Sequence, residues 1–233
     1  MPEMMPGTIL ARRRAFIGGS FAAVAVLALP GCASYPAFSY EEAIRRLLVQ
    51  ASEGAFARLT EPGGYWDQQV AQVGLNGYFG NRGSVLANIL TSALFKSRLE
   101  EVAAVIAIDA SYRVAPVVAD AVRTVGYANA IDLIRGGPTA ATSYLRQEMG
   151  SRLIDALVPE VGEALRVAQD PLVGQLLAGL TGVDVGGVAQ GFATSVENVI
   201  WTEIGREEAA IRANPGATGD RVLREAFGSG ALL

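Results

Sequence analysis

Few side chains in this sequence are of the types that usually catalyse reactions. Its 233 residues include no histidine and a single cysteine, Cys32. Histidine is the commonest general base, and a serine or cysteine nucleophile usually depends on one. Any chemistry must therefore come from carboxylates, arginines, hydroxyl groups or the one lysine, Lys96.

The acidic residues are the best candidates for catalysis. They are the pair Glu100 and Glu101, the pair Glu207 and Glu208, and Asp155. A glutamate with a raised pKa can act alone or with a second carboxylate in a hydrolase, for instance one that cleaves cell-wall glycan. Acidic side chains are mostly exposed, so we interpret each of these first as part of a solvated helix face.

Other catalytic and ligand-binding patterns are weak or missing. Ser92 and Lys96 are four residues apart and would share a helix face, but an exposed lysine is the simpler interpretation. The sequence has no phosphate-binding loop pattern and no Asp-x-Asp-x-Asp-Gly calcium loop. We therefore predict neither a metal site nor a cofactor.

The N-terminus has the pattern of an export signal. Arg12, Arg13 and Arg14 precede an uncharged run of seventeen residues, 15–31. Glycines, a serine and a proline dilute this run, so a removed signal fits better than a permanent membrane span of roughly twenty apolar residues. Arg13 and Arg14, followed by Ala-Phe-Ile, resemble a twin-arginine motif. An ordinary basic region of a general secretion signal is the alternative, and both routes stay open.

The end of the signal resembles a bacterial lipobox. Leu29 stands three residues before Cys32, and Gly31 directly before it, although Pro30 replaces the usual small residue. In such lipoproteins the cysteine thiol is acylated and becomes the new N-terminus. Because Ala33 rather than aspartate follows, the resemblance implies a periplasm-facing protein anchored to the outer membrane. The alternative is a plain buried cysteine.

Composition indicates one globular domain that does not bind nucleic acid. Hydrophobic residues make up 51% of the chain and charged residues 18%. The net charge is −4, and it becomes −6 once three arginines and Glu3 leave with the signal. Nucleic-acid binding needs clustered basic residues, which are missing here. The predicted organisation is a signal peptide (1–31), a lipidated tether (32–39), a helical domain (40–228) and a tail (229–233).

The domain is predicted to be all-α, with seven to nine helices and no strand. Apolar residues recur at helical spacing through most of it, and Val188, Phe192, Val196, Ile200 and Ile204 mark a deeply packed helix. Pro116 is expected to end or kink a helical run, so that two helices meet near Ala115, and Pro159 is expected to turn the chain. The segment 65–83 is expected to be an irregular loop. The predicted helices are 40–59, 84–115, 116–125, 127–135, 139–157, 160–168, 171–180, one that follows Asp184, and 220–227.

Two segments resemble a known family. They are the Gly-Gly-Pro-Thr-Ala-Ala-Thr-Ser-Tyr-Leu segment at 136–145, and the segment at 203–215, which contains Glu-Glu-x-x-Ile-Arg, together with 223–228. They are similar to the bacterial "domain of unknown function 4197" proteins, which are helical and often lipoproteins. The resemblance covers about 40–228. The family's Asn-Arg-Ala-Ala-Glu block is not preserved at 109–113, nor its Gly-Leu-Phe near 197–199, so the chain is a divergent member. The family supplies no activity, cofactor or catalytic residue to carry over.

Two functions remain. The first is a non-catalytic envelope lipoprotein that binds a partner protein or a small apolar ligand, or has a structural role. The second is the carboxylate-dependent hydrolase, which a buried carboxylate lining a cleft would favour. If the chain has a site, we expect it where the family-like polar residues meet, with Arg212 bridging Glu208 as a structural clamp being the simpler interpretation. These residues are Gly136, Gly137, Pro138, Glu208 and Arg212.

Overall fold

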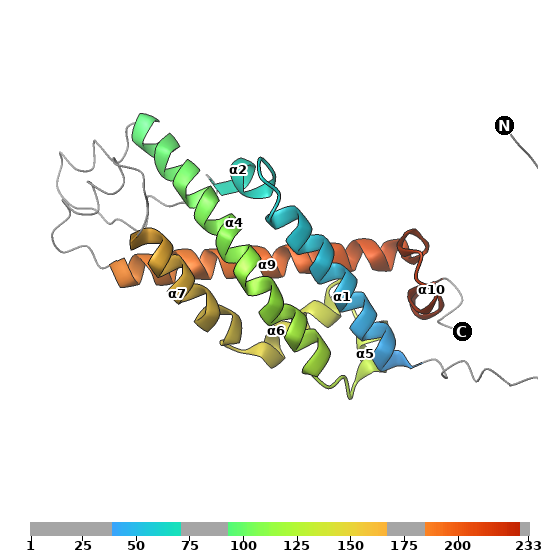
Figure 1. The fold of residues 1–233 in the computed structure, drawn as a ribbon. Helices are drawn as coiled ribbons and strands as arrows, with labels where there is room; N and C mark the ends of the chain where they lie inside the picture. Colours follow the sequence, from blue (N-terminus) through green and yellow to red (C-terminus); the bar gives the residue numbers. More distant parts are fainter. Residues whose placement is uncertain (1–38, 71–92, 167–184, 229–233) are drawn as a thin grey trace, which may run out of the picture. The chain divides into compact units, whose positions relative to one another are not determined.

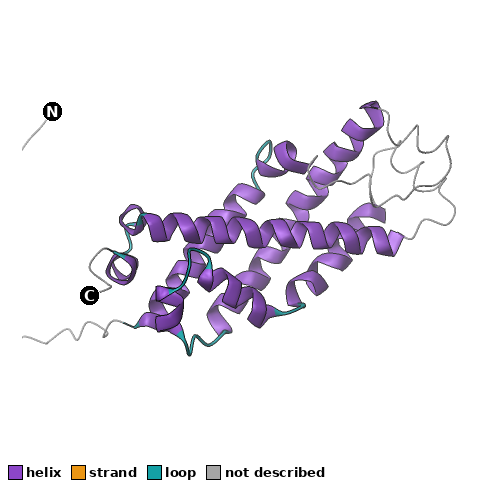
Figure 2. Cartoon of the chain, turned by 180° about the vertical axis from the view of Figure 1, so that it is seen from behind, coloured by secondary structure: helices purple, strands orange, loops and turns teal. Residues whose placement is uncertain are grey.

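The structure is a computed structural model that describes residues 39–70, 93–166 and 185–228. Within these ranges it contains eight α-helices, one 3-10 helix and no strand (Figures 1 and 2). The predicted all-α class and the predicted range of helix numbers are confirmed. The predicted helix at 171–180, the cap at Asp184, Ser92 and most of the predicted loop at 65–83 lie outside the described residues.

The first helix has the predicted bounds. Helix α1 (Tyr40–Leu59) begins after Ser39, whose side chain accepts a hydrogen bond from the Glu42 backbone N–H. Arg46 pairs with Glu42 at 2.7 Å, as the spacing of four residues predicts. The apolar residues of α1 lie on one buried face: Ala43, Ile44, Leu47, Leu48, Ala51, Ala55 and Leu59.

Two predicted helix breaks at prolines are wrong. Helix α4 (Ala93–Thr124) continues through Pro116, and α7 (Arg152–Arg166) continues through Pro159. Each proline removes one backbone hydrogen bond. Burial on both sides of it outweighs that loss, because side chains before and after each proline pack in the core: Val114, Val118, Leu157 and Val161.

A helix break without proline was missed. The segment 139–157 was predicted as one helix, but α6 (Ala140–Met149) ends at Gly150 and α7 begins at Arg152. Gly150 has a φ of +54°, which is the left-handed region that glycine adopts without strain. The chain therefore turns here, and α7 can pack against both α4 and α9.

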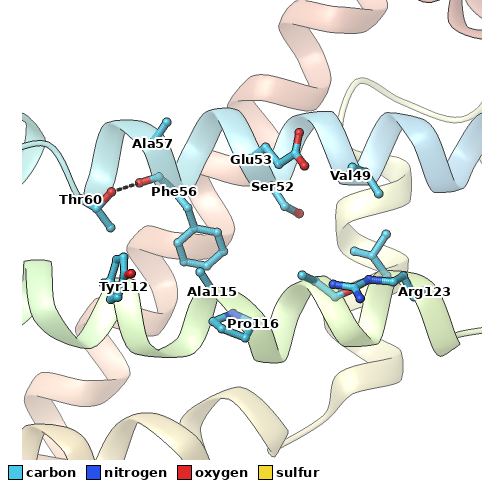
Figure 3. A pocket seen from close by; sticks show the side chains of 12 residues that line it. Val49, Ser52, Glu53, Phe56, Ala57, Thr60, Tyr112, Ala115, Pro116 and Arg123 are labelled. Carbon is cyan, nitrogen blue, oxygen red and sulfur yellow. Dashed lines mark hydrogen bonds between the residues drawn. The ribbon is translucent and has the colours of Figure 1, made fainter.

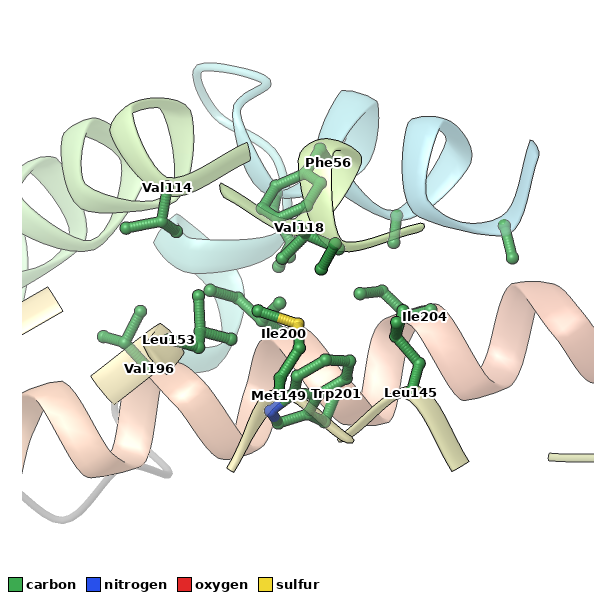
Figure 4. Packing of buried hydrophobic residues seen from close by; sticks show 14 of the residues in the cluster. Phe56, Val114, Val118, Leu145, Met149, Leu153, Val196, Ile200, Trp201 and Ile204 are labelled. Atoms are coloured by element: carbon green, nitrogen blue, oxygen red, sulfur yellow. The ribbon is translucent and has the colours of Figure 1, made fainter. Parts of the chain in front are cut away.

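Helix α9 (Val185–Ala213) is central to the packing. It contacts α1, α6 and α7, and α1 and α7 both pack on α4 (Figure 1). The predicted stripe from Val188 to Ile204 is buried in full. Figure 4 shows Val196, Ile200 and Ile204 facing side chains from other helices, among them Val114 and Leu145. The predicted deep packing of this helix is confirmed.

Four short elements complete the described domain. Helix α2 (Tyr65–Gln69) lies at the start of the predicted loop, and its buried Trp66 donates to the Ser111 hydroxyl at 3.2 Å. Helix α5 (Ala130–Arg135) precedes α6. The 3-10 helix η3 (Pro215–Thr218) leads to α10 (Arg221–Phe227), which Asp220 caps through the backbone N–H groups of Val222 and Leu223.

One described helix is long and apolar enough to cross a membrane by length and composition. It is the Lys96–Thr124 part of α4. The core helix of a globular protein passes the same test. Here α4 packs against α1 and α7, so its apolar residues serve the core.

Candidate functional site

Glu208 is the acidic residue of the predicted cluster, and it is fully buried. Its side chain has no exposed surface, so the expectation of a solvated face is wrong for this residue. One carboxylate oxygen accepts the Ala141 backbone N–H at 3.0 Å, and the other accepts the Thr142 N–H at 2.7 Å. These N–H groups belong to the first turn of α6, where the helix has no internal partners for them.

Arg212 completes the arrangement, one helical turn after Glu208. Its Nε donates to Glu208 Oε1 at 2.7 Å. Its Nη1 and Nη2 donate to the carbonyl oxygens of Ile134 and Leu133, at 3.0 and 2.9 Å, near the end of α5. The guanidinium also lies 4.7 Å from the ring centroid of Phe227 in α10. Together, Glu208 and Arg212 join α5, α6, α9 and α10, and we call this pair the clamp.

The predicted glycines and proline lie beside the clamp. Gly136, Gly137, Pro138 and Arg212 line one pocket of about 390 Å³, together with residues of α10. A Cβ atom on Gly136 would approach the Ala140 Cβ to 2.5 Å, so this close turn requires glycine. Glu208 lies behind Arg212 and does not line the pocket. The structure thus brings the residues of the predicted cluster together. Both carboxylate oxygens of Glu208 accept hydrogen bonds from within the protein.

A second buried acid was missed by the sequence analysis. Glu203 is 3% exposed and lies 3.1 Å from Arg58 at the end of α1. Arg58 also pairs with Glu207, the other member of the predicted acidic pair. Burial raises the pKa of the nearby Tyr65 hydroxyl, and the charge of Glu203 raises it further. The burial of Glu203 could have been predicted from its position next to Ile204, which belongs to the buried stripe of α9.

A groove lies between α1 and α4. Its volume is about 790 Å³. Its apolar lining comes from Val49, Phe56 and Ala57 of α1 and from Ala115, Pro116, Ala119 and Val122 of α4 (Figure 3). Pockets of roughly 300–1,000 Å³ with mostly apolar walls are typical of small-molecule sites.

The groove also contains a buried polar side chain without a hydrogen-bond partner. Ser52 is 5% exposed, and its hydroxyl oxygen has no hydrogen-bond partner. Figure 3 shows its side chain projecting from α1 toward α4. On the opposite wall, Pro116 has no N–H, so the Tyr112 carbonyl lacks its usual helical donor. Buried polar groups are normally paired, so the unpaired Ser52 hydroxyl beside this groove is unusual.

The charges of the groove lie at its rim. Glu53 and Arg123 both line it, and both are exposed. The Arg123 Nε donates to the Ala119 carbonyl oxygen at 3.2 Å, which holds the guanidinium along α4. Among the described residues that line the groove, Glu53 is the only carboxylate. The sequence analysis missed this groove, although a serine on the apolar face of α1 and a proline inside a long apolar helix were visible signals.

The remaining candidate acids lie elsewhere. Glu100 pairs with Lys96 at 3.7 Å, Glu101 pairs with Arg98 at 2.8 Å, and Asp155 accepts a hydrogen bond from Ser151. None of these three acids lines the groove or the pocket beside the clamp. Among the described residues, no three His, Cys, Asp or Glu side chains form a group that could hold a metal ion. The signal and lipobox residues Arg13, Arg14, Leu29, Gly31 and Cys32 lie outside the described residues.

Comparison with known proteins gives a family but no characterised relative. Neither a curated protein nor a solved structure matches the chain. A family model described as "Protein of unknown function (DUF4197)" matches residues 34–228. This match includes every described residue and confirms the resemblance that the two C-terminal segments indicate. The chain belongs to the DUF4197 family of proteins of unknown function.

Proposed function

We propose that this protein is an envelope lipoprotein whose helical domain binds a small apolar ligand in the α1–α4 groove without transforming it. The observation that carries the proposal is the groove itself. It combines a volume of about 790 Å³ and mostly apolar walls with a buried, unpartnered hydroxyl at Ser52. A few convergent polar groups in an apolar pocket are the usual form of a ligand site.

The positions of the acids favour binding over hydrolysis. Glu203 and Glu208, the buried carboxylates among the described residues, line neither the groove nor the pocket beside the clamp. Glycoside hydrolysis usually needs two carboxyl groups about 5–9.5 Å apart across the substrate. Within the described part of the chain, the groove lining offers one carboxylate, Glu53. With no histidine in the chain, no conventional base for a serine nucleophile is available either.

The N-terminal motifs support the membrane part of the proposal. Leu29, Gly31 and Cys32 fit a lipobox, and Arg13 and Arg14 fit an export signal of the twin-arginine type. Acyl chains contribute about 0.8 kcal/mol per buried methylene, so a multiply acylated Cys32 would hold the domain firmly at a membrane. With Ala33 after the cysteine, the proposed location is the periplasmic side of the outer membrane.

Lipidation is tested on Cys32. The Cys32→Ser variant should lose the acyl mass. It should either leave the membrane fraction or stay there only through an uncleaved signal peptide. Ser92→Ala is a matched control that alters one hydroxyl outside the proposed lipobox. An acylated protein in the Cys32→Ser variant, or an unmodified wild-type protein, would contradict the proposed anchor.

Ligand binding is tested by native mass spectrometry of the full chain released from its membrane. We expect a reproducible bound mass that disappears under denaturing conditions. Ala119→Trp, which places an indole in the groove, should abolish this mass, whereas Ala217→Trp on the exposed η3 should retain it. A bare polypeptide mass in wild type would contradict ligand carriage and favour an envelope protein as the partner.

A further inference from the structure

We propose that the α1–α4 groove takes one acyl chain of an uncharged amphiphile, and that Ser52 hydrogen-bonds to a hydroxyl group at the polar end of that chain. This inference rests on the proposed function, because it names the ligand class of the same site. A monoacylglycerol is the simplest molecule of this class.

The apolar walls suit a single extended chain. The groove follows two helices that lie side by side (Figure 3). Small alanines from both helices are among its lining residues and take up little space. These alanines are Ala57, Ala115 and Ala119. Phe56 and Pro116 supply larger apolar surfaces against which methylene groups can pack. Burial of each methylene is favourable by about 0.8 kcal/mol, so a long chain gains enough to bind.

The unpaired polar groups select the polar end. The Ser52 oxygen can donate or accept, whereas the Tyr112 carbonyl can only accept. A hydrocarbon would leave the buried Ser52 hydroxyl unpaired, which is costly in an apolar site. A carboxylate brings acceptors only and would leave the carbonyl without a donor. A ligand with hydroxyl groups can satisfy both walls of the groove.

The rim charges favour an uncharged ligand. Glu53 and Arg123 have opposite signs and both line the groove. A headgroup with net charge would gain from one of them and lose from the other. A neutral headgroup can accept from Arg123 and donate to Glu53 without that conflict.

The proposed anchor explains where such a ligand would come from. Seven residues lie between Cys32 and Tyr40, the first residue of α1, so the eight steps of chain span at most about 29 Å. An acylated Cys32 would therefore keep α1 near a membrane, where single-chain amphiphiles reside. A partner helix fits the groove less well, because its backbone N–H groups are paired internally and only a side chain could reach Ser52.

Photo-crosslinking of the full chain in membrane vesicles tests the inference. The probes are monopalmitoylglycerol and hexadecane, which has no hydrogen-bonding group, each with the same photoreactive group in the chain. We expect monopalmitoylglycerol to label residues 49–60 and 112–123. Ser52→Ala should lower this labelling about fivefold, the size expected for one hydrogen bond, and leave labelling by the hexadecane probe unchanged. Ser143→Ala, at an exposed position, is the matched control and should change neither.

The outcomes separate this inference from the proposed function. If both probes label the groove and Ser52→Ala changes neither, the hydroxyl assignment is wrong while ligand binding stands. If free palmitate competes better than unlabelled monopalmitoylglycerol, the uncharged class is wrong. If Ala119→Trp leaves groove labelling intact, or if the groove crosslinks only to another protein, both proposals are wrong.

Discussion

The clamp and the groove are both places where polar groups lie among apolar ones. They differ in whether those polar groups have hydrogen-bond partners within the protein. In the clamp, both oxygens of the buried Glu208 carboxylate accept hydrogen bonds, and Arg212 donates to α5 carbonyls. In the groove, the Ser52 hydroxyl has no partner. A satisfied buried network holds helices together, whereas an unsatisfied group beside a cavity is free to meet a ligand.

The largest expected effect comes from breaking the clamp. Arg212→Ala leaves the buried Glu208 carboxylate without its charge partner, and we expect it to lower the free energy of unfolding by about 3–5 kcal/mol. Chemical denaturation followed by circular dichroism measures the change. Arg221→Ala is the control, because it breaks an exposed pair with Glu225 worth about 0.5 kcal/mol or less. An Arg212→Ala variant as stable as this control would contradict the structural role of the clamp.

A proline substitution should reveal the cost of the groove. Pro116→Ala supplies the N–H that the Tyr112 carbonyl lacks, so we expect a gain in stability of about 1–3 kcal/mol. The same change should weaken binding of the hydroxyl-bearing amphiphile, because the carbonyl is then paired within α4. Pro159→Ala makes the matched change in α7, outside the groove lining. It should raise stability without affecting binding. Equal losses of binding in Pro116→Ala and Pro159→Ala would contradict a specific role of Pro116 in ligand binding.

Two buried serines allow a direct comparison of paired and unpaired hydroxyls. Ser111 accepts a hydrogen bond from the Trp66 indole, whereas Ser52 has no partner. We expect Ser111→Ala to lower the free energy of unfolding by about 1–2 kcal/mol and Ser52→Ala to change it by less than about 0.5 kcal/mol. Thermal and urea denaturation of the two variants provide the measurement. A large loss in Ser52→Ala would indicate that its hydroxyl serves the fold.

The smallest effect concerns the cap of α10 and depends on pH. Burial favours the neutral form of Asp220, but hydrogen bonds from Arg46 and from the Leu223 and Val222 N–H groups outweigh it and lower the pKa of this carboxyl. Its stabilisation is therefore complete above the unfolded pKa near 3.8 and is lost as pH falls through the lower folded value.

Asp220→Asn should measure this contribution. The variant keeps an oxygen that can cap α10 but loses the ion pair with Arg46, so it should be less stable than wild type by about 0.5 kcal/mol at neutral pH. The difference should shrink as the pH falls below about 4, where the wild-type carboxyl becomes protonated in the unfolded chain. A difference that stays constant down to acid pH would show that the charge of Asp220 contributes nothing.

Local patterns predicted the helices well where packing agrees with them. The bounds of α1 and the buried stripe of α9 follow from helical spacing alone. The breaks at Pro116 and Pro159 were wrong because tertiary burial outweighs one lost hydrogen bond, which no local window reveals. The turn at Gly150 was missed because a positive φ at one glycine among many has no compositional signature.

For the candidate sites too, local spacing could be predicted from the sequence, whereas contacts between distant segments could not. The pairing of Glu208 with Arg212 follows from their spacing of four residues, but the burial of Glu208 depends on the first turn of α6, which is far away in the sequence. The groove has walls from two helices that are separated by more than thirty residues of chain. Two sequence features mark the groove: Ser52 on an apolar face and Pro116 within a helix. They indicate a shared site only once the packing of α1 against α4 is known.

Hydrogen exchange of the full chain in vesicles, with and without monopalmitoylglycerol, tests the contrast between groove and clamp most directly. The account predicts slower exchange in residues 49–60 and 112–123 when the amphiphile is present, and no change in 134–142 and 205–212. Slower exchange at the clamp segments, or no change at the groove segments, would contradict the central claim that the α1–α4 groove is the ligand site.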